Sequence, residues 1–185
     1  MRKAIPFVLV IAVPVLIAAC GGDDDDDGGG VPVDYPYPVE QPTLIDDRSH
    51  FPVGEVYNDY TSDPPTSGPH ANAPAAWGVS DLAVAKEVAI HNMEHAGVVV
   101  WYNCNAGAEP LSTEDCTKLR NDLGEIVQVE IVSGTMVVMT PYPAMDSRIA
   151  LTSWGILDKF DEFDAERVQM FIDTFECNFD PENFC

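Results

Sequence analysis

The first nineteen residues constrain this chain most, because they decide in which compartment it can fold. Arg2 and Lys3 are followed by an uncharged, apolar stretch from Ala4 to Ala19. A short positive segment, an apolar segment and small residues before a cleavage point are typical of an export signal. The stretch contains two prolines and is shorter than the roughly 20 apolar residues that a transmembrane helix needs. Residues 1–19 are therefore predicted to be a signal peptide.

The signal ends in Ile17-Ala18-Ala19-Cys20, which resembles the lipobox of bacterial lipoproteins. In those proteins the chain is cut before the cysteine, and the cysteine sulfur carries a diacylglyceryl group. The resemblance implies that Cys20 is the lipidation site and that the lipid anchors the protein to a membrane outside the cytoplasm. Gly21 stands where an aspartate often marks inner-membrane retention, so the outer membrane is favoured where the cell has one. The alternative is an ordinary signal peptide followed by a disulfide-bonded cysteine.

Residues 20–43 are predicted to be a tether. Positions 21–30 read GGDDDDDGGG, in which glycine gives flexibility and five like charges repel one another. The next segment has four prolines between Pro32 and Pro42 and cannot propagate a helix. Residues 44–185 are then long enough for one globular domain with its own core.

The chain is strongly acidic, with 31 acidic and 9 basic residues and a formal net charge of −22 at pH 7. A surface of this charge repels nucleic acid, so no nucleic-acid partner is expected. Solubility is a simpler explanation than a specific cationic partner.

Four cysteines follow Cys20, namely Cys104, Cys116, Cys177 and Cys185. An even number in an oxidising compartment indicates disulfides, and three pairings are possible. Local pairing, Cys104–Cys116 and Cys177–Cys185, is favoured. Metal ligation by cysteine is the alternative, but neither pair has C-x-x-C spacing.

The pattern predicts an α+β fold, a small mixed or antiparallel sheet with two or three packed helices and a long Pro-rich N-terminal loop. Ser112 and Asp164 are predicted to cap helices that run to about Leu123 and Phe175. Residues 82–90 fit either a helix or a strand. Strands are expected at 98–102, 125–131, 135–140 and 148–154, with Ser133-Gly134 as a turn between the second and third. Residues 50–80 predict a long structured loop, and such loops are usually functional.

All four histidines lie between positions 50 and 95: His50, His70, His91 and His95. On a helix, His91 and His95 face the same way and Glu94 lies beside them, as in a hydrolytic metal site. On a strand, Met93 would join the two histidines and Glu94 would point away, as in a soft His/Met site. Both geometries bring two imidazoles together.

The third and fourth ligands are expected from loops that proline holds rigid. His70 follows a segment with three prolines and a glycine, and Met145 lies in the Pro141–Asp146 segment. Met139 and Met93 are the alternatives to Met145. Glu94 is expected to orient one of the imidazoles. Because imidazole suits copper and zinc and a thioether selects copper, copper is the first choice and zinc the second. The alternative is that the histidines are purely structural.

The same residues carry a resemblance to a known family. In order, the segments HFPVG, PPTSGPH, HNMEHAGVVVWY, PYPAMD and IALTSWG resemble the uncharacterised bacterial family DUF3105, from about His50 to Phe175. Ala96 stands where a second glycine is usual, and Ser153 where alanine is common. Members of the family are typically exported or membrane-anchored, which the resemblance therefore implies here. It implies no activity.

Three functions are open. A lipid-anchored extracytoplasmic protein that sequesters or delivers copper through His70, His91, His95 and Met145 is favoured. The second is a zinc-dependent hydrolase, because His91-x-x-Glu94-His95 resembles the H-x-x-E-H pattern of inverted zinc peptidases, with Glu94 as base. The third is a structural or interaction domain of the cell envelope. Binding is favoured over catalysis.

Overall fold

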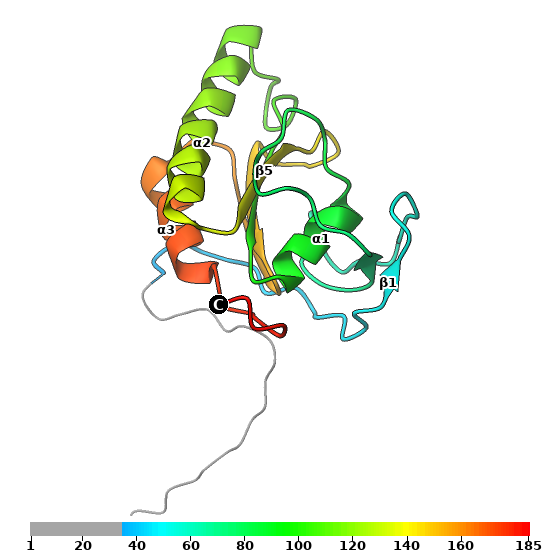
Figure 1. The fold of residues 1–185 in the computed structure, drawn as a ribbon. Helices are drawn as coiled ribbons and strands as arrows, with labels where there is room; N and C mark the ends of the chain where they lie inside the picture. The colour runs from blue at the N-terminus through cyan, green and yellow to red at the C-terminus, as the bar shows by residue number, and fades with distance from the viewer. Residues whose placement is uncertain (1–34) are drawn as a thin grey trace, which may run out of the picture.

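The computed structural model describes residues 35–185 (Figure 1). The predicted signal peptide, the lipidation site Cys20 and the tether up to residue 34 lie outside the described residues. The elements, in chain order, are β1 His50–Phe51, β2 His70–Ala71, β3 Gly78–Val79, α1 Lys86–Glu94, β4 Val98–Tyr102, α2 Thr113–Ser133, β5 Val137–Pro141, β6 Ile149–Ser153, β7 Ile156–Phe160 and α3 Ala165–Phe175.

The core of the domain is a five-stranded mixed sheet of order β3-β5-β4-β6-β7. β3 and β4 pair with β5 in parallel, whereas β6 pairs antiparallel with β4 and β7. β1 and β2 form a separate, two-stranded parallel sheet. The predicted α+β class is therefore confirmed, and of the alternatives that the sequence left open the sheet is mixed and the helices number three among the described residues.

Alternation along the central strand β4 divides the core into two layers. Val98, Val100 and Tyr102 belong to a cluster that packs against α2 and α3, whereas Val99 and Trp101 belong to a cluster that packs against α1. Figure 1 shows α2 and α3 on one side of the sheet and α1 on the other. Because both faces are covered, β4 is apolar throughout, as its sequence predicts.

Helix α2 is longer than predicted, and the strand expected at residues 125–131 is wrong. The Ser112 side chain accepts a hydrogen bond from the Asp115 backbone N–H, as expected for an N-cap. The helix then continues to Ser133, because its buried residues recur at helical spacing: Leu119, Leu123, Val127 and Glu130. Gly134, expected in a turn between strands, instead ends the helix at φ 97°.

The remaining elements follow the sequence more closely. The Asp164 side chain caps α3 by accepting from the Arg167 backbone N–H, and the helix ends at Phe175 as predicted. β5 and β6 lie at the expected segments, with bounds shifted by one or two residues. Of the ambiguous segment 82–90, residues 86–90 belong to α1, and residues 82–85 form the non-helical approach to it. The edge strand β7 has no counterpart in the prediction.

The packed domain begins before Leu44, the expected start. Tyr35 is buried among Phe171 and Phe175 of α3, and its hydroxyl donates a 2.7 Å hydrogen bond to Asp158. Glu40 pairs with Leu157 beside β7. Residues 35–43 therefore pack against the domain, with Tyr35 and Tyr37 on its apolar core. Because of its prolines, this segment is predicted from the sequence to belong to the tether.

Two disulfides, Cys104–Cys116 and Cys177–Cys185, join the four described cysteines in the local pairing favoured by the sequence. Two disulfides in one domain are typical of an oxidising, extracytoplasmic environment. Within residues 35–185, no helix is both long enough and apolar enough to cross a membrane.

The turn from α1 to β4 is tightly packed. Ala96 adopts φ 65°, a left-handed conformation that favours glycine. At Gly97, a Cβ atom would lie 2.5 Å from the ring of Trp77 and 2.9 Å from the Asn92 carbonyl oxygen. Glycine is required there by space, and the turn holds the end of α1 against the sheet.

Candidate metal centre

The pairing of β1 with β2 places two histidines side by side. His50 and His70 are direct partners in the parallel register, and their ring centroids are 4.5 Å apart. Their Nε2 atoms are 3.0 Å apart. In Figure 1 this pair of strands lies beside α1.

The loop before His70 is rigid because it is buried and bonded at several points. Pro64 to Ala71 are all buried. The Ser67 hydroxyl accepts a hydrogen bond from the Ile45 backbone N–H, and the Tyr60 hydroxyl donates to the Pro69 carbonyl. His70 itself is fully buried, and its Nδ1 lies 2.9 Å from the Gly68 carbonyl oxygen. Donation by Nδ1–H to this oxygen fixes the ring and leaves the Nε2 lone pair for a ligand.

Helix α1 supplies the other side of the centre. His91 and Glu94 are buried on it, and the Nδ1 of His91 lies 2.6 Å from the Ala71 carbonyl oxygen. Asn92, between them, is fully buried and exchanges two hydrogen bonds with the Ala75 backbone. The helix and the segment after β2 are therefore clamped together.

One ligand atom each from His50, His70 and His91 lie within 4.8 Å of one another. We call these three residues the histidine cluster. Glu94 closes one side of it, with Oε2 2.9 Å from the Nε2 of His70 and 3.2 Å from that of His50. The side chain of His50 is 40% exposed, whereas that of His70 is 0% exposed, so the cluster reaches solvent on the His50 side. The cluster could hold a metal ion.

The neighbours of the cluster shift two of its pKa values. Burial by itself raises the pKa of Glu94, but the hydrogen bond to His70 and the positive charge of the nearby basic side chains outweigh it and lower the pKa. Burial lowers the pKa of His91, the hydrogen bond to the Ala71 carbonyl opposes this, and the neighbouring imidazoles lower the pKa further. Both shifts favour an anionic carboxylate and a neutral imidazole, the forms that bind metal.

His95 lies at the end of α1, next to the cluster. Its Nε2 is 3.0 Å from the Nε2 of His91 and 3.0 Å from the Oε2 of Glu182 in the C-terminal segment. The ring of Phe184 stacks on the His95 ring at a centroid distance of 4.2 Å. All four histidines of the chain are therefore contiguous.

The sequence prediction named His70, His91 and His95 as ligands and did not name His50. The signal for His50 was present, because all four histidines fall in one segment of the sequence, but nothing in the pattern shows that residues 50 and 70 pair. Met145 and Met93 are buried in the apolar cluster on the α1 side of the sheet. Met139 lies in the cluster on the opposite face. Ligation by Met145 stays a prediction.

Glu94 contacts the imidazoles of the cluster at a defined side of each ring. A side chain that orients an imidazole contacts the ring nitrogen away from the metal. At His70 and His91 that nitrogen contacts a backbone carbonyl, of Gly68 and Ala71. Glu94 instead contacts the Nε2 atoms, on the side where a metal ion would be bound.

Gly68 is expected to be required for this geometry. It adopts φ 117°, and an added Cβ would lie 3.1 Å from Ile45 and 3.3 Å from Tyr60. Gly68→Ala should therefore displace the carbonyl that holds His70, with about a 10- to 100-fold loss of metal affinity, as found for outer partners of metal-binding histidines. Isothermal titration would measure it. The control is Gly134→Ala at the end of α2, where φ is 97° and no atom lies within 4 Å of the added Cβ, and affinity should stay unchanged.

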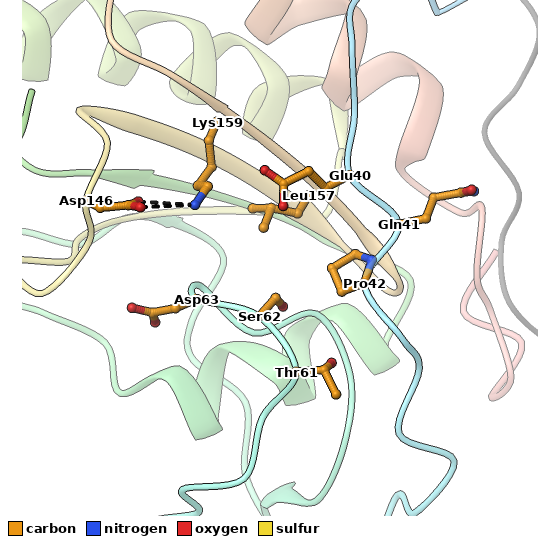
Figure 2. A pocket seen from close by; sticks show the side chains of 9 residues that line it. All are labelled: Glu40, Gln41, Pro42, Thr61, Ser62, Asp63, Asp146, Leu157 and Lys159. Atoms are coloured by element: carbon orange, nitrogen blue, oxygen red, sulfur yellow. Dashed lines mark hydrogen bonds and ion pairs between the residues drawn. The ribbon is translucent and has the colours of Figure 1, made fainter.

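A hollow of about 410 Å³ lies between the N-terminal segment and β7, apart from the histidine cluster (Figure 2). It is lined by Glu40, Gln41, Pro42, Thr61, Ser62, Asp63, Asp146, Leu157 and Lys159. Figure 2 shows Lys159 pointing to Asp146, and its Nζ lies 3.2 Å from the carboxylate. The side chains that line the hollow carry charges of both signs, and none of them is a histidine.

The sequence profile described as "Protein of unknown function (DUF3105)" matches residues 55–184 of the chain. No curated protein and no solved structure matches the chain. The matched segment contains His70, His91, Glu94, His95 and Glu182, whereas His50 precedes it.

Proposed function

This chain belongs to the DUF3105 family, and we propose that it is an extracytoplasmic protein that binds a copper ion in the histidine cluster, for sequestration or delivery. The family description gives no function, so the proposal depends on the site. The fourth ligand is Glu94. The predicted lipid at Cys20 would hold the centre near a membrane surface.

One observation carries the proposal, the meeting of two imidazole Nε2 atoms and one carboxylate oxygen. A neutral His70 that donates Nδ1–H to Gly68 has a lone pair at Nε2, and this atom faces the Nε2 of His50 at 3.0 Å and the Oε2 of Glu94 at 2.9 Å. These atoms are drawn together by a shared positive charge, which a bound metal ion supplies and which a proton on one imidazole also supplies. Ligands about 2.0–2.1 Å from one ion are separated by roughly 2.9 Å in octahedral and 3.4 Å in tetrahedral geometry. The spacing between these atoms falls in that range at its lower end.

The donor types favour copper in its divalent state. Imidazole nitrogens and a carboxylate oxygen suit divalent ions of the later transition metals, and Cu²⁺ binds such sites more tightly than Zn²⁺. Cu⁺ prefers thioethers, and Met93 and Met145 belong to the apolar core. Calcium prefers a shell made of oxygen atoms alone. Zinc is therefore the second choice.

Binding is favoured over the zinc hydrolase. A hydrolase of the H-x-x-E-H type would use Glu94 as a free base, but Oε2 of Glu94 contacts the Nε2 atoms of both His50 and His70. A carboxylate in this position is available as a ligand. The half-exposed His50 gives an ion a path to solvent, which a protein for storage or transfer requires.

A titration tests the proposal. The mature protein, purified from membranes in detergent and stripped with EDTA, should bind Cu²⁺ with a Kd below micromolar. Because the ion binds only the folded state, 100 Kd of free Cu²⁺ should stabilise the protein by about 2.7 kcal/mol and raise its melting temperature. Mg²⁺ serves as the control and should produce no shift. Failure of both Cu²⁺ and Zn²⁺ to bind or to raise the melting temperature rejects the proposal, whereas tighter binding of Zn²⁺ reassigns the metal.

A further inference from the structure

We propose that the centre has a second metal position, formed by His91, His95 and Glu182, next to the one proposed above. The inference rests on the proposed function and deepens it, because a centre with two ions differs in capacity and chemistry from a site with one. It concerns two residues that the single-ion site does not use, His95 and Glu182.

The two donor distances that involve His95 match those of the first position. The Nε2 of His95 lies 3.0 Å from the Nε2 of His91 and 3.0 Å from the Oε2 of Glu182. Both distances correspond to neighbouring ligands around one ion, at roughly 2.9–3.4 Å. Since the Nδ1 of His91 is directed at the Ala71 carbonyl, its Nε2 is left as an acceptor that faces His95.

The six donors divide into two equal sets. With its Nδ1 occupied, His91 can bind only one ion. When His91 binds the second ion, His50, His70 and Glu94 still form a set of three donors for the first. Their ligand atoms are 3.0 Å (His50 to His70), 2.9 Å (His70 to Glu94) and 3.2 Å (His50 to Glu94) apart. Each set then consists of two imidazoles and one carboxylate, a combination that binds a metal on one side and leaves positions open on the other. His91 serves the first ion when one is bound and the second when two are bound.

The two positions are neighbours. The ring of His91 lies 5.0 Å from that of His50 and 5.1 Å from that of His70. Ligand atoms of all three lie within 4.8 Å of one another. Ions bound by the two sets would therefore be neighbours within one centre.

The C-terminal segment holds Glu182 in place. The Cys177–Cys185 disulfide closes it into a loop, and the Asp180 carboxylate accepts hydrogen bonds from the backbone N–H groups of Phe184 and Cys185. The Cys177 backbone N–H donates to the Ala96 carbonyl, directly after His95. The loop is thus fixed to the same turn that ends α1, and Phe184 covers the outer face of the His95 ring.

The second position is the more exposed of the two. The side chains of His95 and Glu182 are 18% and 45% exposed, whereas in the first set only His50 is exposed, at 40%, and His70 and Glu94 are 0% and 5% exposed. Water competes more strongly with exposed ligands, so the second ion should bind more weakly than the first and exchange faster.

The number of ions per chain tests this inference. The EDTA-stripped mature protein is titrated with Cu²⁺, and bound copper is counted by metal analysis after free copper is removed. Two ions per chain are expected, and paramagnetic resonance should show the magnetic coupling of two adjacent Cu²⁺ ions. Glu182→Gln should bind one ion and give the spectrum of an isolated Cu²⁺. Glu125→Gln, an exposed change of the same charge on α2 across the sheet, should keep both ions and the coupling.

The outcomes separate this inference from the proposed function. No bound copper in the unmodified protein overturns both. One ion in the unmodified protein supports the histidine cluster and overturns the second position. Two ions that persist in Glu182→Gln, or that show no coupling, place the second ion elsewhere and also overturn it.

Discussion

His70→Ala is expected to weaken Cu²⁺ binding about 100-fold or more while the domain stays folded. Structural zinc sites with four ligands bind with about 10–16 kcal/mol, so one ligand contributes roughly 3 kcal/mol, which corresponds to about two orders of magnitude in Kd. His70 is the ligand that touches both His50 and Glu94, so its loss also removes the contacts that align them. Competition titration against a chelator of known affinity measures the change.

Two further variants separate the loss of a ligand from a loss of stability and test methionine as a ligand. His70 is fully buried, and its removal leaves a cavity, so His50→Ala, at a half-exposed position, should lose affinity with a smaller change in stability. Met145→Leu keeps the volume of the side chain and should leave affinity unchanged, because the proposed ligand set contains no thioether. Unchanged affinity in both histidine variants contradicts the proposed site, and a large loss in Met145→Leu restores the methionine as a ligand.

Arg167→Met is expected to destabilise the domain by about 3–5 kcal/mol, because it leaves a buried carboxylate without its charge partner. Asp158 is 1% exposed on β7, and the guanidinium of Arg167 binds it through two nitrogens, with the Nε–Oδ2 distance at 2.8 Å. The same guanidinium packs on the ring of Phe160 at 4.2 Å. A loss of this size should lower the melting temperature by roughly 10 °C in a domain of this length.

Arg120→Met is the control for the effect of burial on the strength of an ion pair. Arg120 forms an exposed ion pair with Asp81 at 3.4 Å, and such pairs contribute less than about 1 kcal/mol. A third variant, with Arg167→Met and Asp158→Leu together, should recover part of the lost stability, because it removes the stranded charge. Equal, small effects at positions 120 and 167 would contradict the role given to this pair.

The sequence predicts the parts of the fold that depend on local signals. Three such signals are each compatible with one kind of element only. They are the apolar run at 98–102, the caps at Ser112 and Asp164, and the helical spacing up to Phe175. The segment 125–131 is compatible with two kinds, because its β-branched residues suit a strand while Val127 also continues the helical face that begins at Leu119. The segment is helical because this face packs against the sheet and α3, a tertiary contact that the local sequence does not show.

The candidate site is predictable in part for the same reason. His91, Glu94 and His95 are neighbours on one helix, so their proximity follows from helical geometry. The parallel pairing of His50 with His70 joins two segments separated by a loop without periodicity, and no local rule gives its register. The contact of Glu182 with His95 depends on how a disulfide-closed loop folds back, which also lies beyond local pattern.

The two-residue pairing of β1 with β2 has a kinetic consequence. His50 is held by this short pair, whereas His70 and His91 sit in buried segments that open only with much of the domain. Short elements at a surface open locally at far lower free energy than core elements do. We therefore expect transient detachment of the His50 strand to set the dissociation rate of the ion. Transfer to an acceptor protein would then proceed by ligand exchange at His50 first, without global unfolding.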